Sequence, residues 1–95
     1  MIDKINVVDF AKGNFGKYVA VTDEGFTFNI TKDEYKKLLG QEIVQEPLKI
    51  EREVTCIYTR NKKCFAKYAE GEIEISRKKY DKLYEELNEY SVPFN

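Results

Sequence analysis

The sequence contains no histidine and no tryptophan, and it has only two cysteines and two prolines. The missing histidine removes the commonest general base and the commonest transition-metal ligand, so Ser-His-Asp and Cys-His catalysis are both excluded. Two cysteines, Cys56 and Cys64, are too few for a disulfide framework, and each is predicted to be a buried free thiol. These absences argue against most enzyme classes.

Long apolar runs and an excess of one charge are also missing. No stretch approaches the roughly 20 apolar residues that span a membrane, and the first residues lack the pattern of a signal peptide. We therefore expect a cytoplasmic protein with no membrane partner. Sixteen basic and seventeen acidic residues give a net charge of −1. This balance argues against a strongly basic nucleic-acid binder and a strongly acidic DNA mimic, although local patches can still bind charged partners.

What the sequence does contain is an internal repeat. Residues 17–25 align with 63–71, and residues 27–39 align with 72–84 when one residue, Phe26, is skipped; eight of the twenty-two aligned positions are identical. The predicted elements follow the same order in both halves. We predict one domain, 1–95, made of two tandem repeats at about 1–40 and 47–95, joined by a linker at 41–47.

Each repeat is predicted to hold three strands followed by a helix. The strands are expected at about 4–11, 17–22 and 26–30, and at about 48–59, 64–69 and 72–75. Thr31 with Glu34 forms a capping box, Ser76 caps the second helix, and Gly40 is expected to end the first. The fold class is therefore α+β, a duplicated βββα unit whose antiparallel sheet or sheets carry two helices on one face. The pattern leaves open one six-stranded sheet or two stacked sheets, and the tail 91–95 is expected to be extended.

No catalytic motif is present. The chain has no phosphate-binding loop, dinucleotide fingerprint or nucleophile elbow. The acidic pairs Glu51/Glu53 and Glu72/Glu74 alternate outward on strands, which is typical of a solvated sheet face. We predict no enzyme activity, no cofactor and no metal site.

The second repeat is predicted to gather cations at one end. The turn at 60–63 should lie beside the start of the second helix, because the strands at 64–69 and 72–75 form a hairpin. This places six residues in a basic corner that would bind an anion or a partner: Arg60, Lys62, Lys63, Arg77, Lys78 and Lys79. Three cations in a first helical turn oppose the helix dipole, whereas the first repeat has the favourable Asp33-Glu34 there. A solvated lysine-rich end is the alternative interpretation.

A second surface is predicted on the sheet face opposite the helices. Strict alternation places five apolar residues there: Val7, Val19, Val21, Ile57 and Phe65. A large exposed apolar patch on a sheet face usually marks an interaction surface. Two stacked sheets could bury it, the chain could form a homodimer through it, or a different protein could cover it.

Two functions from different classes remain. The first is a non-enzymatic protein–protein interaction module, whose partner would present an acidic surface or be a ribonucleoprotein. Small phage and mobile-element inhibitors of host defence, such as anti-CRISPR proteins, are similar in type, although no motif is shared. The alternative is a small nucleic-acid-binding protein that uses the basic corner, with Phe15 in the turn at 13–16 as the one aromatic expected to be exposed.

Overall fold

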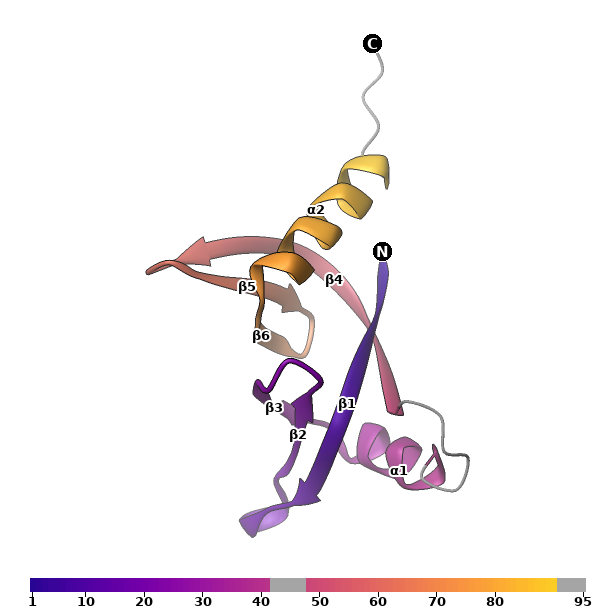
Figure 1. The fold of residues 1–95 in the computed structure, drawn as a ribbon. Helices are drawn as coiled ribbons and strands as arrows, with labels where there is room; N and C mark the ends of the chain where they lie inside the picture. Colours follow the sequence, from indigo (N-terminus) through magenta and orange to yellow (C-terminus); the bar gives the residue numbers. More distant parts are fainter. Residues whose placement is uncertain (42–47, 91–95) are drawn as a thin grey trace.

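The described part of the chain forms a single six-stranded antiparallel sheet with two helices (Figure 1). The computed structural model describes residues 1–41 and 48–90. Its elements are β1 (Ile2–Lys12), a 3₁₀ turn (Asn14–Gly16), β2 (Tyr18–Thr22), β3 (Thr27–Ile30), α1 (Lys32–Gln41), β4 (Leu48–Arg60), β5 (Lys63–Tyr68), β6 (Gly71–Ile75) and α2 (Arg77–Tyr90). The α+β class and the predicted order of strands and helices are confirmed. Apart from Gln41, the predicted linker lies outside the described residues, as does the tail.

The strand order is β3-β2-β1-β4-β5-β6, so the first strand of each half lies at the centre of the sheet. β1 and β4 pair antiparallel, with Ile5 opposite Ile50 and Asp3 opposite Arg52. This arrangement decides the question that the sequence left open, because all six strands belong to one sheet. The apolar face opposite the core is therefore not buried between two stacked sheets.

Local sequence explains where the helices begin. Thr31 and Glu34 form the predicted capping box, in which each side chain accepts a hydrogen bond from the other residue's backbone N–H, at 3.1 and 2.8 Å. Ser76 accepts a hydrogen bond from the N–H of Lys79 at 3.1 Å. The first helix does not end at Gly40 but continues to Gln41, whose side-chain amide pairs with both backbone groups of Lys49.

The core lies where both helices meet the sheet. Leu38 of α1 and Leu83 of α2 are its most enclosed large side chains, at 0% and 1% exposed, and both belong to one cluster with strand residues from all six strands. α1 packs against β1 and β4, and α2 packs against β5 and β4. The central strand β4 thus supports both helices.

Two β-bulges change which side chains enter this core. One interrupts the pairing of β1 with β2 between Val7 and Asp9, and the other interrupts the pairing of β4 with β5 between Val54 and Cys56. The extra residue reverses the alternation beyond it, because side chains in a strand alternate with period two. The face predicted for several residues is consequently wrong.

Candidate functional site

The predicted apolar surface is smaller than alternation suggested. Val7 is 3% exposed within the core, and Ile57 packs against the core from beyond the second bulge. Val19, Val21 and Phe65 are half-buried, and the pairing register puts them on the face away from the core. That apolar face is not continuous, because exposed polar residues of β1 and β4 interrupt it: Lys4, Asn6, Lys49, Glu51 and Glu53.

The second bulge also changes the cysteines. Cys56 is exposed and pairs opposite Lys67, whereas Cys64 is buried, and both are free. The prediction of a buried thiol is therefore wrong for Cys56. Val8 is likewise turned out of the core by the first bulge and is 63% exposed.

The predicted basic corner is only partly assembled. The register Cys64 opposite Ile75 brings the start of β5 beside the start of α2, as the hairpin argument requires. Three of its six cations nevertheless form ion pairs with carboxylates that are not part of the predicted corner. Arg60 approaches Glu72 at 3.4 Å, Arg77 approaches Asp81 at 3.0 Å, and Lys79 approaches Asp3 at 2.9 Å. Within the described residues, Lys62, Lys63 and Lys78 form no ion pair.

Arg60 belongs instead to a cluster on the face away from the core, which we call the aromatic–arginine cluster (Tyr58, Arg60, Phe65 and Glu72). The rings of Tyr58 and Phe65 stack with centroids 5.3 Å apart and planes 18° apart, and the guanidinium carbon of Arg60 lies 5.1 Å from the Phe65 ring centre. The Tyr58 hydroxyl donates a hydrogen bond to the Glu72 carboxylate, which raises the pKa of Tyr58. The cluster is a preorganised, half-exposed surface of aromatic and cationic groups.

Beneath α1 lies a buried ion pair. Arg52 donates from Nε and Nη2 to the two carboxylate oxygens of Glu34, at 2.9 and 2.8 Å, and from Nη2 to the carbonyl of Asn29 at 2.9 Å. Its guanidinium also lies over the ring of Phe28, 5.3 Å from the centroid. Burial opposes ionisation of Glu34, but the hydrogen bonds from Arg52 and Thr31 outweigh it and lower the pKa of Glu34.

A second polar chain lies beneath α2. Asp3 accepts hydrogen bonds from the hydroxyl of Tyr68 at 2.8 Å and from Nζ of Lys79 at 2.9 Å. Burial, followed by the charge of Asp3, strongly raises the pKa of Tyr68, so this phenol remains a hydrogen-bond donor. Sequence reasoning missed both chains, although alternation from Ile50 and Val54 does point Arg52 inward.

The turn between β2 and β3 reaches across to the other half of the chain. Glu24 accepts hydrogen bonds from both the backbone N–H of Ser76, at 3.1 Å, and its hydroxyl. In α1, Glu34 supplies the carboxylate of the capping box from within the helix. In α2 the corresponding position is Lys79, and the carboxylate comes from Glu24 instead.

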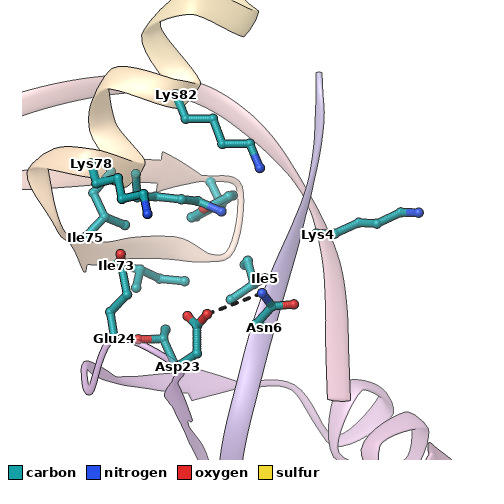
Figure 2. Close-up of a pocket in the computed structure, with 12 residues that line it drawn as sticks. Lys4, Ile5, Asn6, Asp23, Glu24, Ile73, Ile75, Lys78 and Lys82 are labelled. Atoms are coloured by element: carbon teal, nitrogen blue, oxygen red, sulfur yellow. Dashed lines mark hydrogen bonds between the residues drawn. The ribbon is translucent and has the colours of Figure 1, made fainter. Parts of the chain in front are cut away.

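A cavity of about 300 Å³ opens between this turn, β1, β6 and α2 (Figure 2). Its lining divides into an apolar floor and a polar rim. The floor holds Ile5, Tyr68, Ile73 and Ile75, and the rim holds Lys4, Asn6, Thr22, Asp23, Glu24, Lys78, Lys79 and Lys82. Figure 2 shows Lys78 and Lys82 extending from α2 beside this space, while Lys4 points away from it.

Among residues 1–41 and 48–90, no three or more Cys, Asp or Glu side chains converge into a group that could hold a metal ion. No described helix has the length and apolar character needed to cross a membrane. Comparison of the chain with protein-family models, with curated proteins and with solved structures finds no match.

Proposed function

We propose that this protein is a non-enzymatic interaction module that binds a protein partner with an acidic surface. The observation that supports this most directly is the aromatic–arginine cluster. Tyr, Phe and Arg are enriched at protein interfaces, and Tyr and Arg recur among the few residues that dominate binding energy. Here two stacked rings hold Arg60 in place, so little side-chain freedom is lost when a partner binds.

The neighbouring turn supports an acidic partner. Lys62 in the β4–β5 turn and Lys63 at the start of β5 follow Arg60 after Asn61, and both are exposed. Asn61 and Lys62 both have positive φ, 52° and 66°, which makes a tight two-residue turn. The turn therefore presents its cations next to the aromatic rings. A small phage or mobile-element inhibitor of host defence, or a ribonucleoprotein-binding protein, would use such a surface in this way.

The proposal extends to the origin of the fold, which we infer to be a duplicated βββα unit with both helices on one face of the sheet. Each half has a bulge in its first strand, a Glu-Gly turn between its second and third strands, and a hydroxyl cap before its helix. The partner-binding cluster belongs to the second half only. Val19 and Ala11 face each other in the first half, where Phe65 and Tyr58 face each other in the second.

Affinity purification from a cell lysate tests the proposal with matched variants. We expect a protein to co-purify with the wild-type chain and to be reduced about 30-fold by Arg60→Glu, the loss typical of a dominant interface residue. Lys12→Glu is the control, because Lys12 ends β1 as Arg60 ends β4. Equal recovery with both variants contradicts the assignment of the surface. Sedimentation of the purified chain shows in the same preparation whether the partner is a second copy.

Nucleic-acid binding through the basic corner is the second candidate, favoured by rings and cations on the same hairpin. Anisotropy of labelled single-stranded DNA, duplex DNA and RNA at about 50 and 200 mM salt distinguishes the two. Three of the six cations are ion-paired, so we expect no micromolar binding. If a nucleic acid binds at micromolar concentration and the binding weakens steeply with salt, nucleic-acid binding replaces the protein-partner proposal. Loss of that binding in Arg77→Glu/Lys78→Glu, but not in Lys32→Glu, would locate the binding surface in the second half.

A further inference from the structure

The cavity beneath α2 occupies the place that a side chain fills beneath α1. The first bulge follows Val7 and the second follows Val54. Ile5 lies two residues before Val7, and Arg52 lies two residues before Val54. The two residues therefore stand at corresponding points of the two central strands. Arg52 is a long side chain that spans the interior, whereas Ile5 is short.

The surroundings correspond as well. The side chains around Arg52 include Glu34, Phe28 and Glu70, the last at 4.0 Å. Their counterparts, at the same positions relative to each helix cap or turn glycine, are Lys79, Ile73 and Glu24. All three line the cavity together with Ile5. The cavity is thus lined by Ile5 and Ile73 at the positions where the other half has an arginine and a phenylalanine.

The charge of the site is inverted between the halves. Beneath α1 a carboxylate, Glu34, faces the interior and receives a cation. Beneath α2 the corresponding residue is Lys79, and Lys78 and Lys82 stand beside it on the same helix. The complement of this wall is therefore an anion.

The rim also carries two carboxylates, Asp23 and Glu24, which keep their negative charge and lie on the turn between β2 and β3 rather than on α2. Asp23 accepts a hydrogen bond from the Asn6 side chain at 3.3 Å, and Glu24 accepts those of Ser76. In the described part of the chain neither forms an ion pair with Lys78 or Lys82. Lys78 and Lys82 therefore leave two exposed ammonium groups without an ion pair on the α2 side of the cavity, across from these carboxylates and above the apolar floor.

We propose that this cavity binds a small organic anion, a phosphate or carboxylate group attached to an apolar body. The apolar body would rest on Ile5, Ile73 and Ile75, and the anionic group would meet Lys78 and Lys82 at the rim. A volume of about 300 Å³ lies at the small end of ligand pockets, which limits the ligand to about one ring and its substituents. The site is separate from the aromatic–arginine cluster, so its test does not depend on the protein partner.

Titration of the ¹⁵N-labelled full chain with phenyl phosphate, followed by amide chemical shifts, tests the proposal. We expect saturable shifts at Thr22, Asp23 and Ile73, with a dissociation constant of about 1 mM or tighter. Benzylamine, which has the same ring and the opposite charge, should bind at least about ten-fold more weakly. Equal binding of benzylamine, or no saturable shifts with phenyl phosphate, overturns the proposal.

Two variants separate the charge from the cavity. Lys78→Glu/Lys82→Glu should weaken phenyl phosphate at least about ten-fold, whereas Lys36→Glu/Lys37→Glu, the same change in charge on α1, should leave it within about two-fold. Ile73→Phe, which supplies the ring that Phe28 supplies beneath α1, should fill the cavity and abolish binding while the chain stays folded. Two results would overturn the cavity assignment and indicate a phosphate contact at the surface. One is that inorganic phosphate binds as tightly as phenyl phosphate, and the other is that phenyl phosphate still binds to Ile73→Phe.

Discussion

The interior beneath α1 and the interior beneath α2 differ in what fills them. Beneath α1, Arg52 and Glu34 form a buried pair with side chains 2% and 10% exposed. Beneath α2, Lys79 reaches Asp3 from a more open position, with 21% of its side chain exposed, and a cavity remains in front of it. Corresponding backbone positions therefore enclose a buried polar pair in one half and line an open cavity in the other.

The comparison shows how exchanges at two positions can open a site without changing a fold. Arg52 corresponds to Ile5, and Glu34 corresponds to Lys79. A buried ion pair must be complete, because one partner alone leaves an uncompensated charge. Beneath α2, Lys79 has its own charged partner, because it donates a hydrogen bond to Asp3 of the central strand β1.

The largest expected loss of stability comes from breaking the buried ion pair between Arg52 and Glu34 beneath α1. Arg52→Met should lower the free energy of unfolding by about 3–5 kcal/mol, because it leaves the Glu34 carboxylate buried without its partner. Lys79→Met, the matched change beneath α2, should cost only about 1–2 kcal/mol, since Lys79 makes one hydrogen bond, to Asp3, where Arg52 makes three, and is itself more exposed. Urea denaturation of both variants measures the difference, and equal losses would contradict the comparison.

An acid titration of stability should also distinguish the two sides. The pKa of Glu34 is lowered from 4.5 in the folded protein, so its contribution to stability is fully present above that pH. It is lost as the pH falls through the lowered folded value. We expect the free energy of unfolding to fall more steeply below about pH 4.5 in the wild type than in Glu34→Gln. Urea midpoints measured between neutral and acidic pH test this, and parallel curves for the two proteins would refute it.

The smallest effect concerns the two Glu-Gly turns. Glu24→Ala should cost about 0.5–2 kcal/mol, the range for losing a helix cap, because Glu24 binds both polar groups of Ser76. Glu70→Ala should cost less than about 0.5 kcal/mol, since Glu70 is at the surface and only 4.0 Å from Arg52. Thermal unfolding of the pair measures both costs, and a Glu70→Ala loss equal to that of Glu24→Ala would remove the difference between the turns.

Much of the fold could be predicted from the sequence, because turn glycines, capping residues and apolar spacing are local signals. The predicted strand at 4–11 is Ile2–Lys12, and the helix cap at Ser76 begins α2 at Arg77. The two bulges could not be predicted, because nothing local in the sequence marks the extra residue. They moved Val7 and Ile57 to the core face and Cys56 and Tyr58 away from it.

The sites were less predictable than the fold. The basic corner was predicted from two segments that one hairpin brings together, but Asp3, which binds Lys79, is 76 residues away along the chain. The ion pair between Lys79 and Asp3 depends on the strand order, which places β1 at the centre of the sheet. The cavity depends in turn on the short side chain of Ile5 at one particular position of that strand.

The polar contacts between the halves also determine how the chain folds. Arg52 with Glu34, Lys79 with Asp3, and Ser76 with Glu24 each join a residue before the linker to a residue after it. A fragment that contained only one half would expose the hydrogen-bonding edge of its central strand and leave these groups without partners. The order of elements repeats, but these contacts join the two halves, so we expect the described part of the chain to unfold in a single transition.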